Sequence, residues 1–188
     1  MMGPLWDATR DLHHACEAHP LGQRMVEATI EAQDWCDWLN ALRVLHSAID
    51  PHLPPYAQVT GELTLDLVEM LPMVPQPVNA AQAFAGTLQT PERIGGAAYV
   101  LVGAHRRGGR VTEKRFREAG RKLPMRHVRF FAPDPAEALV KSLRDMGQLA
   151  SAASATFQCL LDVMDEIVAR GDFATAPTVP DAKLKTQP

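Results

Sequence analysis

The stretch LWDATRDLHHACEAHPLGQRM, residues 5–25, has the clearest helical pattern in the chain. Positions suited to a buried face recur every three or four residues, at Leu5, Thr9, Leu12 and Cys16. This spacing is the period of an α-helix that buries one side. Pro20 disfavours helical geometry at the residue before it, so the helix is expected to end at His19. The stretch therefore predicts an amphipathic first helix followed at once by a second element.

The histidines of this helix occupy different faces. At ~100° per residue, His13 falls at the edge of the buried face and His14 points to water. Three interpretations of His13 remain open: a packed core histidine, a zinc ligand together with Cys16 and His19, or an axial ligand of haem. Structural zinc requires four ligands, and no fourth ligand stands at a suitable spacing. A haem requires only one imidazole beside an apolar slot.

The composition indicates a single globular domain. A chain of 188 residues with 46% hydrophobic side chains can bury one sizeable core, but hardly two. No apolar run approaches the ~20 residues that span a bilayer, and the first residues show no export signal. Three cysteines, an odd number without a CxxC pair, suit reduced thiols. We therefore expect a cytoplasmic protein.

The rest of the chain reads as helices separated by prolines and glycines. Further helices are expected at 21–31, 35–50, 61–71, from Pro91 onward, from Val111 onward, from Pro135 onward and at 149–168. The apolar run 97–104 resembles a buried strand, but no second run exists to pair with it, so it is assigned as helix. The prediction is an all-α bundle of about seven or eight helices. Residues 1–171 form its single domain, and residues 172–188 form a disordered tail.

A basic segment, residues 106–129, contrasts with the net charge of −3 of the whole chain. It contains ten basic and two acidic residues, which suits an anionic ligand or partner, or a solvated helix face. A nucleic-acid-binding protein is an alternative, but the segment has little aromatic interleaving and no helix-turn-helix signature. A non-haem di-iron protein is another. Spaced acids occur at Glu62, Asp66 and Glu69, without the Glu-x-x-His pattern of such sites.

Residues 5–25 also resemble the first helix of haem oxygenases, whose pattern is close to L-x-x-A-T-x-x-x-H-x-x-x-E. The matching positions are Leu5, Ala8, Thr9, His13 and Glu17. Residues 96–111, GAAYVLVGAHRRGGRV, are similar to the distal helix of bacterial members, typically G-x-x-Y-V-L-E-G-S-x-L-G-G. Residues 129–146 and 155–167 resemble the C-terminal helices. The likeness covers roughly residues 4–167 and is strongest to the bacterial, biliverdin-producing type associated with bacteriophytochromes.

The resemblance implies a haem-oxygenase-like multi-helix bundle in which b-type haem is both cofactor and substrate. It makes His13 the proximal iron ligand, with Glu17 one turn away to orient the imidazole. Gly103 and Gly108 would let the distal helix approach the macrocycle and the bound O2. The implied reaction converts haem to biliverdin, CO and iron.

The resemblance also implies partners. The cations expected to hold the haem propionates are Arg10, Arg107, Lys141 and Arg144. The expected partners are haem, an electron donor such as a ferredoxin or a reductase, and a bilin acceptor. Neither a membrane nor a nucleic acid is expected as a partner.

The distal helix departs from the family pattern. Val102 stands where the family has glutamate, Ala104 where it has serine, and the segment 105–107, His-Arg-Arg, where it has small apolar residues. Arginines facing the iron would crowd or polarise the O2 site. The second reading is therefore a haem- or bilin-binding protein of the same fold without oxygenase activity. His46, on the tryptophan face of the third helix, is a core histidine or a second pocket residue, and we expect it in the core.

Overall fold

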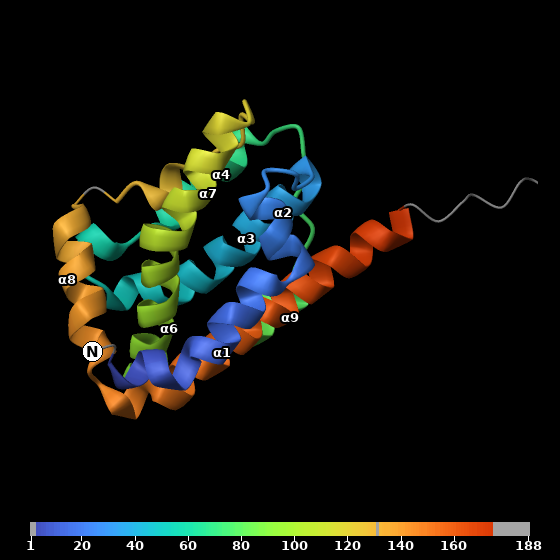
Figure 1. Cartoon of the computed structure of the whole chain (residues 1–188). Helices are drawn as coiled ribbons and strands as arrows, with labels where there is room; N and C mark the ends of the chain where they lie inside the picture. Colours follow the sequence, from blue (N-terminus) through green and yellow to red (C-terminus); the bar gives the residue numbers. More distant parts are fainter. Residues whose placement is uncertain (1–2, 131, 175–188) are drawn as a thin grey trace, which may run out of the picture.

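The computed structural model describes residues 3–130 and 132–174, with the side chains of 171–174 left out of the description (Figure 1). The α-helices are α1 (Pro4–Ala18), α2 (Pro20–Val26), α3 (Ala32–Ile49), α4 (Thr60–Glu69), α5 (Asn79–Ala85), α6 (Pro91–Ala104), α7 (Arg110–Glu118), α8 (Pro133–Arg144) and α9 (Ala150–Ala174). These residues contain no strand, which confirms the all-α prediction. α9 continues to Ala174, and residues 175–188 of the predicted tail lie outside the described residues.

The helix boundaries follow from local chemistry. Pro4, Pro20 and Pro91 stand at the first turns of α1, α2 and α6, where a missing N–H costs nothing. Thr90 caps α6, because its hydroxyl accepts a hydrogen bond from the Arg93 N–H. The helix from Pro91 does not end as an α-helix: it passes at residue 105 into η3 (His105–Gly109), a π-helical segment that leads directly into α7.

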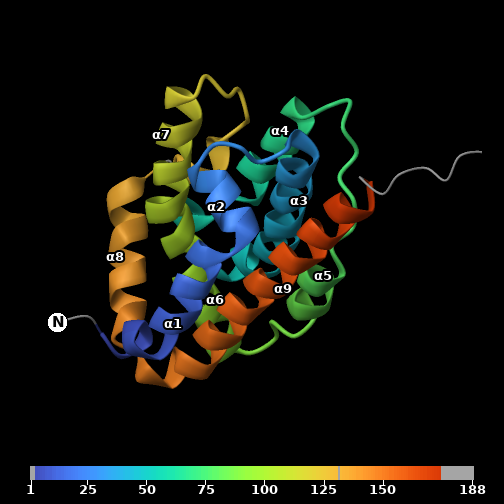
Figure 2. The same cartoon turned by 45° about the vertical axis from the view of Figure 1, so that its right-hand side comes forward.

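The long helix α9 organises the packing. It lies between α1 and α5 (Figure 2) and also contacts α6. A Cβ atom at Gly96 of α6 would lie 2.5 Å from Ala152 Cβ of α9, so glycine is what permits these two helices to approach so closely. The predicted stripe of the last helix is confirmed, since Ala153, Phe157 and Met164 are buried.

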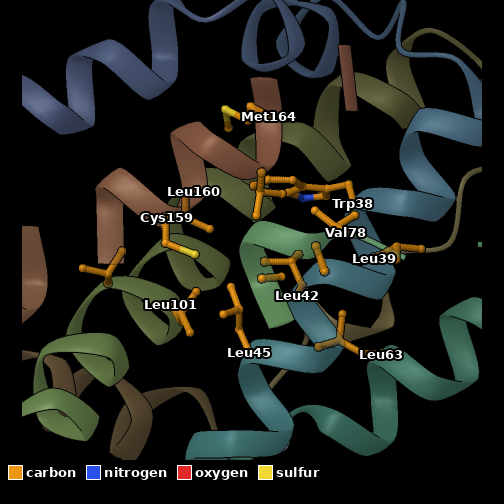
Figure 3. Close-up of a cluster of buried hydrophobic side chains, with 14 of the residues drawn as sticks. Trp38, Leu39, Leu42, Leu45, Leu63, Val78, Leu101, Cys159, Leu160 and Met164 are labelled. Atoms are coloured by element: carbon orange, nitrogen blue, oxygen red, sulfur yellow. The ribbon is translucent and has the colours of Figure 1, made fainter. Parts of the chain in front are cut away.

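The core surrounds α3. Trp38, Leu42 and Leu45 of this helix meet side chains of α6, α9 and α4, among them Leu101 and Leu160 (Figure 3). The first helix buries Leu5 and Thr9 as its pattern predicts, and the Thr9 hydroxyl donates to the Leu5 carbonyl at 2.7 Å. Among the described residues, no helix combines the length and the hydrophobicity that crossing a membrane requires.

Candidate functional site

A cavity of about 340 Å³ lies between α1, α3, α6, η3 and α9. Small-molecule sites typically have volumes of ~300–1,000 Å³ and mainly apolar walls. Most of this wall is apolar, and its members include Trp6, Met25, Leu42, Leu101, Val111 and Phe157. Three histidines also line the cavity: His13, His105 and His127. The combination suits a largely apolar ligand that needs a few fixed polar contacts.

His13 lies at the edge of the buried face of α1, as the helical geometry predicts. Its side chain is 37% exposed, and its ring packs edge-on against Phe157 with centroids 5.7 Å apart. Nδ1 is buried, lies 3.6 Å from Glu17 Oε2 and has no hydrogen-bond partner. Nε2 likewise makes no hydrogen bond within the described residues. His13 is therefore not a satisfied core histidine, and its imidazole is open to a ligand.

The neighbours of His13 do not form the zinc site considered from the sequence. His19 uses both ring nitrogens elsewhere: Nδ1 accepts from the Leu21 N–H at 3.1 Å, and Nε2 lies 3.1 Å from Asp165 Oδ1. Burial raises the pKa of the Cys16 thiol to about 11, with a further contribution from Glu17, which disfavours the thiolate that zinc requires. His14 is exposed, as predicted.

One group with metal-binding side chains does occur on α1. Donor atoms of His13, His14 and Glu17 lie within 4.8 Å of one another, and it is the only such group in the described part of the chain. The di-iron alternative gains no support. Asp66 accepts hydrogen bonds from the protein, and Glu69 pairs with Arg126 at 2.8 Å.

The wall formed by α6 and η3 contains the two predicted glycines. Gly103 and Gly108 both line the cavity. A Cβ at Gly108 would meet no atom within 4 Å, so this glycine borders open space, whereas one at Gly103 would lie 3.6 Å from Val140. Gly109 has a different role, since a Cβ there would collide with Val128. Short π-helical segments inside longer helices are frequent at functional sites.

His105 points inward from this segment. It is 4% exposed, and its Nε2 lies 2.8 Å from His46 Nε2. His46 is fully buried, as predicted for a core histidine, and its Nδ1 lies 3.0 Å from Asp50 Oδ1. Burial lowers the pKa of both imidazoles, that of His105 well below its ordinary value. Both rings are consequently neutral near pH 7.

His127, from the turn η4 (Arg126–Val128), is the third histidine of the cavity. Its Nδ1 lies 2.6 Å from Asp66 Oδ2, and its ring stands edge-on to that of His105, with centroids 5.0 Å apart. No sequence pattern predicts a role for His127, and His105 stands out in the sequence only as a departure from the distal pattern. Their partners are 61 and 59 residues away in the chain, which no local pattern reveals.

Two of the four arginine and lysine candidates reach the cavity. Arg107 and Arg144 line it close to Tyr99, whose pKa is raised by burial and lowered in part by these two cations. Neither arginine forms an ion pair with any described residue. Arg10 pairs with Asp11 at 3.1 Å and Lys141 with Glu137 at 3.2 Å, and neither is part of the cavity wall.

Much of the basic segment 106–129 is neutralised by neighbouring acids. Arg106 donates to Glu137 at 2.7 Å, and Arg126 to Glu69 at 2.8 Å. Further pairs join Arg110 and Arg129 to Glu113, and Lys114 and Arg115 to Glu118. The segment is thus mainly a solvated, ion-paired surface, and Arg107 is its cation with a place in the cavity wall.

Comparison with known proteins identifies solved structures that share this arrangement of helices. No protein-family model and no curated protein sequence matches the chain. Among solved structures, haem oxygenase from Leptospira interrogans superposes with a TM-score of 0.70 at 16% identity, over 88% of this chain and 97% of that one. Haem oxygenase-1 from the cyanobacterium Synechocystis, in complex with haem, gives 0.71 at 13% identity, over 90% and 92%. The chain has the all-α fold of the haem oxygenases.

Proposed function

We propose that this protein is a cytoplasmic haem oxygenase, which binds haem through His13 and converts it to biliverdin, CO and iron with O2 and external electrons. The observation that carries the proposal is His13 itself. Its unpartnered imidazole stands in the wall of an apolar cavity that a glycine-containing π-helical segment also lines, in the haem oxygenase fold. Cys16, Cys36 and Cys159 are free thiols, which suits a reducing compartment.

The residues present fit a haem. Glu17 Oε2 lies 3.6 Å from Nδ1 of His13, on the side of the ring away from Nε2, so Nε2 would bind the iron. When haem is bound, a small movement of Glu17 would let it accept a hydrogen bond from Nδ1 and set the tautomer of the ring. Gly108 lines the cavity and a Cβ there would meet no atom within 4 Å, so its backbone would be open to close approach by a flat macrocycle. When bound, the haem supplies the iron that activates O2 and the ring that is oxidised. The protein side contributes orientation, an apolar surrounding that excludes water, and buried imidazoles that handle protons.

Arg107 and Arg144 are proposed to hold the propionates. Replacing either by glutamine is expected to weaken hemin binding by about fivefold, because a partly exposed charge pair contributes up to about 1 kcal/mol. Arg10→Gln and Lys141→Gln are matched controls, since these side chains pair with Asp11 and Glu137 away from the cavity. Titration with hemin measures all four dissociation constants. Equal weakening in all four variants would show only a general effect of net charge.

Turnover is tested directly. Purified protein loaded with hemin receives ascorbate, or a ferredoxin with its reductase, in the presence of O2. We expect the Soret band to decay while biliverdin and CO form in equal amounts. Absence of any Soret shift on adding hemin would contradict the haem site itself.

The second candidate is a haem- or bilin-binding protein without oxygenase activity. It is favoured by the helix that resembles the distal helix of haem oxygenases, where Val102 and Ala104 stand in place of polar residues and buried His105 begins the π-helical segment. A His13-ligated complex that survives reduction and O2 without forming biliverdin would select this candidate.

A bilin acceptor is a proposed partner of the oxygenase. Release of biliverdin only when a bilin-binding protein is added would support this partner.

A further inference from the structure

A chain of three buried side chains connects two separate spaces of the molecule. His105 lines the cavity that contains His13, and Asp50 lines a second hollow of about 450 Å³. His46 lies between them, 2.8 Å from His105 and 3.0 Å from Asp50, and it is fully buried. The second hollow is bordered by the exposed residues Gln58 and Glu62, so it opens to solvent. The three side chains thus span the wall between solvent and the cavity.

The hydrogen bonds of Asp50 fix the direction of this chain. Its Oδ2 accepts hydrogen bonds from the N–H groups of Val59 and Thr60, at 2.9 and 2.7 Å, and from the Thr60 hydroxyl. Burial alone would raise the pKa of Asp50, but the hydrogen bonds from His46 and Thr60 outweigh it and hold the pKa below its ordinary value. Asp50 is therefore ionised and can only accept.

The tautomers of the two histidines follow. His46 must donate from Nδ1 to Asp50, and as a neutral ring it presents a bare Nε2. His105 must then donate its Nε2–H to His46, which leaves the lone pair of His105 Nδ1. Within the described residues Nδ1 of His105 has no hydrogen-bond partner, and it is not among the fully buried unpaired atoms. His105 Nδ1 is therefore the atom of these three side chains that is accessible from the cavity.

We infer that His105 is the acid–base residue of the cavity and that Asp50 and His46 relay protons to it from the hollow that opens to solvent. The inference rests on the proposed function, because reduction of O2 in the cavity consumes protons. When the three side chains together hold one proton more than in the resting arrangement, Asp50 is protonated and donates to His46 Nδ1. His46 Nε2 then donates to His105 Nε2, and His105 Nδ1 carries a hydrogen. His105 gives that proton to the reduced oxygen, and each remaining proton moves one step inward. This restores the resting arrangement. Reloading takes one proton from the hollow onto Asp50, together with a tautomer change in both rings that moves the hydrogen of His46 from Nδ1 to Nε2 and that of His105 from Nε2 to Nδ1.

Few other titratable groups face this chain. His127 from η4 is edge-on to His105 and is itself held by Asp66 of α4. His46 and His127 both oppose protonation of His105, and His127 also opposes protonation of His46. His127 lies beside the relay and has no hydrogen bond to it.

The first test uses the haem-free protein. Long-range ¹H–¹⁵N spectra of the histidine rings report which nitrogen carries hydrogen. We expect Nδ1–H for His46 and Nε2–H for His105. In Asp50→Asn the amide oxygen is needed by the N–H groups of Val59 and Thr60, so the amide NH₂ faces His46 Nδ1. Nδ1 must then accept, and the His46 hydrogen is expected to move to Nε2. The opposite tautomers in the wild type, or an unchanged His46 tautomer in Asp50→Asn, would overturn the relay whether or not the protein turns over haem.

The second test measures turnover of the hemin-loaded full chain. His46→Gln keeps a polar side chain toward His105 but cannot pass a proton. We expect about 100-fold slower biliverdin formation, a larger solvent deuterium isotope effect and loss of one ionisation from the pH profile. The Soret titration is expected to stay as in the wild type, which also verifies folding. His52→Gln, an exposed histidine in the same turn as Asp50, is the matched control.

The outcomes separate the two proposals. Wild-type protein that binds haem but forms no biliverdin contradicts the proposed oxygenase, and the tautomer experiment then decides the relay. Wild-type turnover with an unchanged rate and pH profile in His46→Gln overturns the relay and leaves the oxygenase standing.

Discussion

Replacing His13 by alanine is expected to abolish the Soret band of the histidine-ligated haem complex. Loss of an outer partner of a metal-ligating histidine already lowers metal affinity by about 10–100-fold, so loss of the ligand itself should exceed that. The apolar cavity remains, and residual hemin binding without an iron–imidazole bond is expected to be weak. Hemin titration followed at the Soret maximum measures both the affinity and the ligation. Glu17→Gln should produce a smaller loss, since Glu17 only orients the ring.

His14→Ala is the matched control for this variant. The two histidines are neighbours on α1, but His14 is exposed and absent from the cavity wall. It should leave the spectrum and affinity unchanged. Added imidazole should restore a histidine-like spectrum to His13→Ala, because the small base can occupy the space that the side chain vacates. A wild-type Soret band in His13→Ala without imidazole would show that another residue ligates the iron.

The sequence predicts the fold well wherever one helix face repeats over several turns. Leu5 and Thr9 of α1 are buried at the expected positions, and so are Phe157 and Met164 of α9. The helix α5 was not predicted. It has seven residues and one of them, Ala81, is buried, which is too little for a periodic pattern to develop. Short helices of this kind form because their neighbours, here α3 and α9, cover them.

In the candidate site, too, the residues placed by the geometry of one helix are predictable from the sequence, and those placed by contacts between distant segments are not. The face of His13 is local geometry on one helix, so the sequence suffices to place it beside the cavity. The roles of the glycines are not local: Gly108 adjoins open space, whereas Gly109 is required by Val128 nearly twenty residues later. Arg107 and Arg144 come together at Tyr99 although all three lie on different elements.

The divergent segment at 105–107 also gains a physical explanation. His105 lies four residues after buried Leu101 and therefore continues the buried face of α6 toward His46, whereas Arg107 is exposed. Arg106 donates a hydrogen bond to Glu137 on α8. The residues that break the distal pattern of the family therefore do not crowd the cavity together. One enters a buried hydrogen-bonded chain, one pairs with a neighbouring helix, and one reaches the cavity wall.

Replacing Asp66, the partner of the cavity residue His127, by alanine is expected to be strongly destabilising. This fully buried carboxylate accepts from the Arg126 N–H at 3.0 Å and from His127 through its N–H at 3.2 Å and its ring Nδ1 at 2.6 Å. Alanine leaves three donors without a partner. Each buried unsatisfied donor costs about 1–3 kcal/mol, so the total exceeds about 3 kcal/mol out of a typical ~5–15 kcal/mol. Urea unfolding followed by far-ultraviolet circular dichroism measures the loss.

Two variants of α4 identify the cause. Glu69→Ala removes an exposed carboxylate that also contacts Arg126, and it should leave the unfolding midpoint almost unchanged because solvent replaces the lost contact. Asp66→Asn keeps one acceptor oxygen, so it should fall between the two. Equal midpoints for Asp66→Ala and Glu69→Ala would mean that η4 is held by apolar packing around Val128 and not by Asp66. In that case His127 would owe its place in the cavity wall to the same packing, and its ring orientation would be free to change when a ligand enters.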